Sequence, residues 1–188
     1  MYIVGKTGMG KSTLLLNMIL SDIHADEGLC VLDPHGDLID KILGYIPERR
    51  FSDVILFDPS DKDYPIGFNI FYAHSELEKD ILASDIVAIF KRLSKNWGEQ
   101  MTCLLRNAML AILESERGGT LYDLKRFLVE KEFREGFLKT VKDKEVIYYW
   151  QKEFPLLSSN PQAPILTRLD IFLKSKILRN IVCQKENK

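Results

Sequence analysis

The stretch that decides how this chain is interpreted reads Gly5-Lys6-Thr7-Gly8-Met9-Gly10-Lys11-Ser12. It matches the pattern G-x-x-x-x-G-K-[ST] of phosphate-binding loops. In such a loop, backbone N–H groups and the positive end of the following helix surround the phosphate oxygens. Gly8 and Gly10 allow the positive φ angles that the turn requires. The stretch therefore predicts a binding site for the phosphates of a nucleotide.

Two side chains of the loop have expected roles toward ATP and Mg²⁺. Lys11 is expected to bridge the β- and γ-phosphates as the catalytic cation, and the Ser12 hydroxyl is expected to bind Mg²⁺. Asp33 is a weaker metal candidate, and it has an alternative role as the acceptor of N–H groups in a turn. The residues predicted to bind the nucleotide are Gly5, Lys6, Thr7, Gly8, Met9, Gly10, Lys11, Ser12 and Thr13.

The first part of the chain alternates between two hydrophobic patterns. Residues 1–4, 29–33 and 54–58 are short apolar runs, which are typical of buried strands. Residues 13–20 and 38–43 lie between them and have helical patterns, the second with Asp37 as its expected cap. This alternation predicts an α/β fold whose parallel sheet has right-handed crossovers.

Beyond residue 73 the spacing of apolar residues becomes helical, with steps of three and four. We therefore place a first domain at residues 1–73 and an all-α domain at residues 74–188. The expected helices cover residues 76–90, 101–113, 120–128, 133–141, 146–154, 165–173 and 178–182, with a loop at 155–164.

Composition and charge narrow the class of protein. The 188 residues are 46% hydrophobic and 28% charged, which suits a globular protein. No run approaches the roughly 18 apolar residues of a membrane span. Cys30, Cys103 and Cys183 lack the spacing of a metal site, so we expect a reducing, cytoplasmic location.

The two parts of the chain differ in charge. Residues 1–75 hold 6 Lys and Arg against 11 Asp and Glu, a balance of −5, whereas residues 76–188 hold 20 against 16, a balance of +4. The second part is therefore the better candidate to face a polyanion, with ordinary solvated helix surface as the alternative. Lys91, Arg92 and Lys95 either neutralise the end of a helix or contact a DNA backbone.

Several further stretches accompany the loop: Asp33-Pro34-His35-Gly36-Asp37-Leu38, Gly67-Phe68-Asn69-Ile70, Trp97-Gly98, Leu105-Arg106-Asn107-Ala108, Thr120-Leu121-Tyr122-Asp123 and Leu178-Arg179-Asn180-Ile181. Together with the loop, they resemble the HerA/FtsK superfamily of hexameric DNA-pumping ATPases, and within it the TraG/TraD-like coupling proteins of conjugation and type IV secretion. The resemblance implies a partial RecA-like core followed by a helical insertion. It also implies DNA, a homo-hexamer and a membrane-associated secretion complex as partners.

The chain also departs from that family. There, the metal-binding Asp and the catalytic Glu follow the helical insertion, but no apolar run ending in Asp-Glu follows Phe71 here. We therefore expect an N-terminal piece of a longer ATPase, shortened at its front as well, with little hydrolysis of its own. Two alternatives stay open: a phosphotransferase that acts on a small molecule, and a nucleotide-binding assembly module without turnover.

Overall fold

The computed structural model describes residues 1–157 and 160–187, and these form two compact units, Met1–Leu56 and Phe57–Lys188. Every regular element of the described residues is helical, and they contain no β-strand. The predicted α/β fold with a parallel sheet is therefore wrong. Residues 57–73, which the sequence pattern places in the first domain, fold with the second unit.

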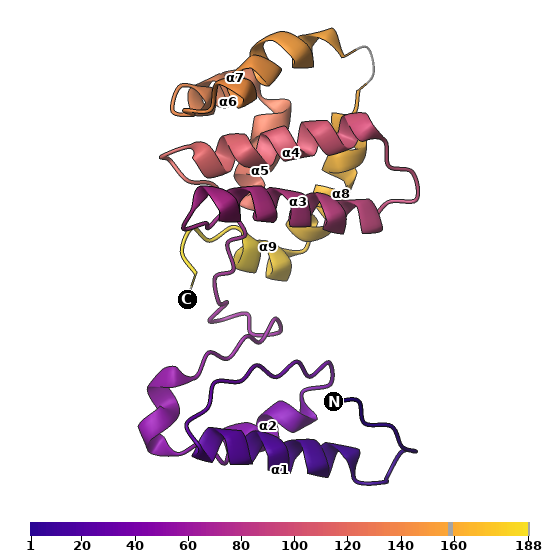
Figure 1. Ribbon diagram of the computed structural model, residues 1–188, viewed down its shortest axis with the longest axis vertical. Coiled ribbons are helices and arrows are strands. Elements are labelled where there is room, and N and C mark those ends of the chain that lie inside the picture. Colours follow the sequence, from indigo (N-terminus) through magenta and orange to yellow (C-terminus); the bar gives the residue numbers. More distant parts are fainter. Residues whose placement is uncertain (158–159, 188) are drawn as a thin grey trace. The chain divides into compact units, whose positions relative to one another are not determined.

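The first unit consists of two α-helices and one short 3₁₀-helix. Helix α1 (Lys11–His24) packs against α2 (Asp37–Leu43), and η1 (Glu48–Asp53) follows (Figure 1). Helix α1 begins at Lys11, where the loop motif implies the start of a helix, and it extends past the apolar stretch at residues 13–20 to His24. Each of these α-helices buries one residue, Ile23 in α1 and Ile42 in α2.

The three apolar runs that predicted strands are irregular and exposed. Tyr2 is 91% exposed, Leu32 90% and Ile55 74%. A parallel sheet needs a ladder of hydrogen bonds between its strands and a cover on both faces. In the first unit, whose residues are all described, no backbone hydrogen bond joins one run to another. An apolar run shows a preference for a strand, but it does not provide the neighbour that a strand needs.

The second unit is a helical bundle. Its elements are α3 (Glu76–Arg92), α4 (Glu99–Glu114), α5 (Leu121–Val129), α6 (Lys131–Leu138), α7 (Lys144–Tyr148), the π-helical η2 (Tyr149–Glu153), the 3₁₀-helix η3 (Phe154–Leu156), α8 (Gln162–Lys174) and α9 (Lys176–Val182). Helix α4 lies at its centre and contacts α3, α5, α6, α7 and α8 (Figure 1). Its apolar positions at three- and four-residue steps are buried on several sides.

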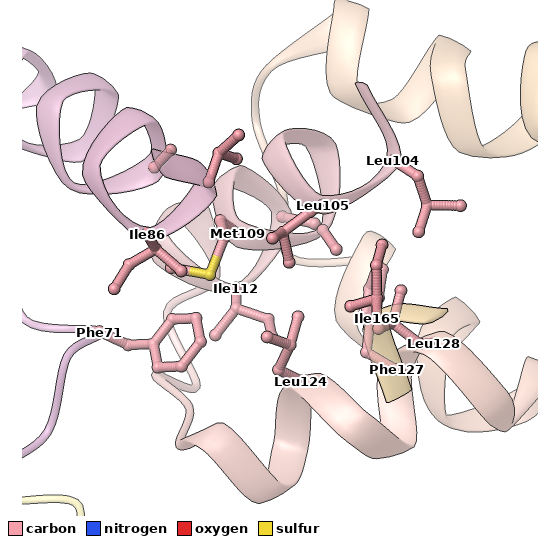
Figure 2. Packing of buried hydrophobic residues seen from close by; sticks show 14 of the residues in the cluster. Phe71, Ile86, Leu104, Leu105, Met109, Ile112, Leu124, Phe127, Leu128 and Ile165 are labelled. Atoms are coloured by element: carbon pink, nitrogen blue, oxygen red, sulfur yellow. The ribbon is translucent and has the colours of Figure 1, made fainter. Parts of the chain in front are cut away.

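One hydrophobic core fills this bundle. Leu104, Leu105 and Met109 of α4 are fully buried, and Phe127 and Ile165 reach the same core from α5 and α8 (Figure 2). All members of the core cluster belong to the second unit. Burial of this apolar surface is the main source of stability for the bundle.

Local signals fix several helix boundaries of the second unit. Thr120 and Asp123 form a capping box at the start of α5, within the stretch 120–128 where the sequence predicted a helix. Helix α6 begins earlier than the helix expected from residue 133, and α8 begins at Gln162 rather than after Pro164. A proline is tolerated in the first turn of a helix, which explains the early start of α8. The loop expected at 155–164 includes residues 158–159, which lie outside the described residues.

A helix that crosses a membrane must be both long and apolar. None of the described helices combines the length with the apolar character that crossing a membrane requires.

The distribution of the core predicts how the two units behave apart. We expect a protein of residues 57–188 to show a helical circular dichroism spectrum and a cooperative thermal transition, since the whole core cluster lies within it. A protein of residues 1–56 serves as the comparison and should unfold without cooperativity, because it buries only Ile23 and Ile42. A gradual, non-cooperative transition of residues 57–188 would contradict this description of the core.

Candidate functional site

The loop at residues 5–12 forms a turn that leads directly into α1. Gly8 has a φ of 84° and Gly10 a φ of 80°, so both lie in the left-handed region that favours glycine. The Met9 N–H donates to the carbonyl oxygen of Lys6 over 3.3 Å. A Cβ atom at Gly8 or Gly10 would meet nothing within 4 Å. Both glycines are thus required by their backbone conformation, and the space beside them is open.

The side chain of Lys11 folds back over this turn. Its Nζ donates to the carbonyl oxygen of Gly5 over 2.8 Å and to that of Lys6 over 2.9 Å. The methylene groups of Lys11 pass over Gly5, where an added Cβ would lie 3.7 Å from Cγ and Cδ. The ammonium group is therefore held beside the loop, and these contacts leave one of its three N–H donors.

The start of α1 adds further donors at the same place. The first N–H groups of any α-helix have no acceptor within the helix, and no side chain caps them in α1. The residues that begin this helix are Lys11, Ser12 and Thr13, and the last two are exposed. The positive end of the helix dipole lies there as well. The donors and the charge of the loop are therefore those of an anion site.

The charged side chains next to the loop in the sequence are positive. Residues 1–21 contain Lys6 and Lys11 and no acidic residue. A carboxylate beside the loop would compete with a phosphate for the same donors. Within residues 1–21 no side chain competes in this way.

Asp33 lies at the turn before α2 and caps that helix. Its Oδ2 accepts hydrogen bonds from the N–H groups of Leu38 at 2.8 Å and Ile39 at 3.4 Å, and its Oδ1 accepts from His35 at 3.1 Å. These bonds, with that from Leu38 the strongest, hold the pKa of the Asp33 carboxyl below its ordinary value. Asp33 thus has the turn role that the sequence offered as the alternative to metal binding. The expected cap, Asp37, is instead the first residue of α2.

Asp58 has a similar local role in the second unit. Its Oδ1 accepts hydrogen bonds from the Ser60 hydroxyl at 2.7 Å and the Ser60 N–H at 2.8 Å, and these lower the pKa of the Asp58 carboxyl. This is the geometry of a turn stabilised by its own aspartate. In the part of the chain that the structure describes, no group of three or more His, Cys, Asp or Glu side chains is arranged to hold a metal ion.

Arg106 and the basic residues at the end of α3 lie in different surroundings. Arg106 donates to Asp80 and to Ser84, and it therefore braces α4 against α3. Lys91 and Arg92 lie exposed in the last turn of α3, and exposed Lys95 follows the helix. The basic residues at the end of α3 can reach a polyanion in solvent, whereas Arg106 is already engaged within the bundle.

Sequence reasoning missed the role of Asn69. This residue is 7% exposed and is one of the few buried polar residues in the described part of the chain. Its partners come from residues far away in the sequence, Gly119 and Lys185. The only local signal is a polar amide inside an otherwise apolar stretch at residues 67–71.

The chain was compared with known proteins. No family model, no curated protein and no solved structure matches it. The resemblance to DNA-pumping ATPases therefore stays a hypothesis from the sequence.

Proposed function

We propose that the loop at residues 5–12 binds the phosphates of ATP together with Mg²⁺. The observation that carries this proposal is the position of the Lys11 ammonium, which lies over the loop beside the uncapped start of α1. A phosphate oxygen can replace the carbonyl oxygens of Gly5 and Lys6 as the partner of this ammonium. The carbonyl oxygens that now accept from the ammonium are neutral, whereas a phosphate oxygen carries negative charge and would make the contact an ion pair as well as a hydrogen bond.

Other groups at the loop are candidates for the remaining contacts with phosphate and Mg²⁺. The N–H groups at the start of α1 have no side-chain acceptor and are available to an anion, and Gly8 and Gly10 leave the approach open. The exposed hydroxyl of Ser12 is the candidate ligand for Mg²⁺, which binds oxygen and commonly keeps several waters. Asp33 is a poorer candidate, because its carboxylate already accepts three backbone hydrogen bonds.

Calorimetric titration with ATP and Mg²⁺ tests this proposal. The substitution Lys11→Ala should weaken ATP binding by about 10- to 100-fold, because it removes charge-assisted hydrogen bonds to the phosphates. The matched control is Lys6→Ala, which removes the same charge. Lys6 contacts the Lys11 ammonium through its backbone carbonyl, so this substitution keeps that hydrogen bond. Equal losses of affinity in both variants would show a diffuse charge effect and would contradict a specific role for Lys11.

We further propose that the nucleotide site belongs to an ATPase that moves DNA. The support is the resemblance of the motifs, the excess of basic residues in the second part of the chain, and the exposed cations at the end of α3. Phosphate contacts require only mobile basic side chains in reach of the backbone. Lys91, Arg92 and Lys95 meet this requirement, and they also neutralise the carbonyl end of α3.

The salt dependence of DNA binding tests the second step. Changing Lys91, Arg92 and Lys95 to Gln should reduce the slope of log K against log salt by about 0.7 to 0.9 for each phosphate that the protein no longer neutralises. Fluorescence anisotropy with single- and double-stranded DNA measures this slope. The control changes Lys139, Lys142 and Lys144 to Gln, which removes the same charge from another exposed region. No DNA binding by the chain, or equal effects of both triple variants, would contradict this interface.

A further inference from the structure

The two ends of the helical unit are tied together by hydrogen bonds. The N–H of Phe68 donates to the carbonyl oxygen of Ile181 in α9 over 3.0 Å. The side chain of Gln184 donates to the carbonyl oxygens of Pro65 and Asn180, each over 2.8 Å. The segment before α3 and the segment after α9 therefore lie side by side.

The side-chain amide of Asn69 is the centre of this arrangement. Its Nδ2 donates to the carbonyl oxygen of Gly119 over 3.0 Å and to that of Lys185 over 2.9 Å, and its Oδ1 accepts from the N–H of Phe71 over 2.9 Å. Two donors thus face two carbonyls, and one acceptor faces an N–H group. Among side chains of this size only an amide satisfies all three, because a carboxylate has no donors.

The side chain of Asn187, in the segment after α9, binds the backbone of Asn69. Its Oδ1 accepts from the N–H of Asn69, and its Nδ2 donates to the carbonyl oxygen of Asn69 over 3.3 Å. Gly67 lies against residues 184–187, the tail that follows α9, where an added Cβ would overlap the carbonyl oxygen of Glu186. The backbone of residues 67–69 and that of residues 184–187 therefore approach each other too closely for a larger residue at position 67.

The burial of Asn69 makes these contacts interdependent. Asn69 is buried next to Phe71, which belongs to the hydrophobic core. If the tail moved away, the amide of Asn69 would lose the acceptor on Lys185 and its backbone would lose Asn187. A buried donor without a partner costs free energy. The loss of one hydrogen bond therefore destabilises the closed arrangement in which the other hydrogen bonds form.

We propose that residues 67–71, Gly119 and residues 184–187 form a clasp, which opens and closes as one step and separately from the helical core. While the clasp is closed, a displacement applied to one end of the helical unit is transmitted directly to the other end. When it opens, the tail is released while α4 and α5 keep their packing. This proposal does not depend on the nucleotide site.

Hydrogen exchange of the full chain, resolved at single amides, tests the clasp. In Asn187→Ala, only the N–H of Asn69 loses an acceptor directly, whereas Phe68 and Phe71 keep theirs. A clasp that opens as one step predicts exchange about tenfold faster at all three amides. Exchange in the middle of α4 and α5 should stay as in the unchanged protein.

Two further variants complete the experiment. Asn69→Asp keeps the shape of the side chain and removes both of its donors. This variant should accelerate exchange at Phe68 and Phe71 at least as much as Asn187→Ala does. If that variant does not fold, Asn187→Ala decides alone, since Asn187 is exposed. Asn96→Ala changes another exposed asparagine and should leave the clasp amides unchanged.

Two results would overturn the proposal. If only the Asn69 amide accelerates in Asn187→Ala, the hydrogen bonds break independently and no clasp exists. If exchange accelerates equally through α4 and α5, the contacts belong to the general stability of the bundle.

Discussion

The proposed function depends on one interaction. The ammonium group of Lys11 donates hydrogen bonds to the carbonyl oxygens of Gly5 and Lys6. The group is positively charged, half-exposed and fixed beside the start of a helix whose first N–H groups have no side-chain cap. Such a site prefers an anion, since both the helix end and the ammonium are positive. The carbonyl contacts hold the lysine beside the loop, and a phosphate that binds there would take the place of these carbonyl oxygens as the partner of the ammonium.

The two units differ in how they are held together. The bundle of residues 57–188 has a continuous core around α4, with polar contacts such as the capping box of α5 at its ends. The unit of residues 1–56 buries only Ile23 and Ile42 and leaves most of its apolar side chains in solvent. Regions with little buried apolar surface open at low free-energy cost. The proposed nucleotide site therefore lies in the less stable unit, and a ligand that binds only its folded form would stabilise it.

The helices could be predicted from the sequence because their signals are local. The periodic apolar residues of α3 and α4, and the Thr120–Asp123 capping box, act within a few turns of the chain. The strands were predicted wrongly for the opposite reason. Residues 1–4, 29–33 and 54–58 have the composition of buried strands, but a sheet depends on pairing between distant segments.

The same distinction applies to individual residues. The left-handed glycines at positions 8 and 10 and the start of α1 follow from the motif itself. The cap formed by Asp33 was only one of two roles that the sequence allowed, because the same carboxylate suits a turn or a metal. The position of Asn69 could not be predicted, because its partners lie at residues 119, 185 and 187.

Nuclear magnetic resonance of the ¹⁵N-labelled chain, titrated with ATP and Mg²⁺, tests the central claim most directly. We expect the amide signals of Gly8, Gly10, Lys11 and Ser12 to shift together and saturate at a single affinity, because these groups would surround the bound phosphates. Saturable shifts confined to other residues, or no saturable shift at all, would contradict the claim.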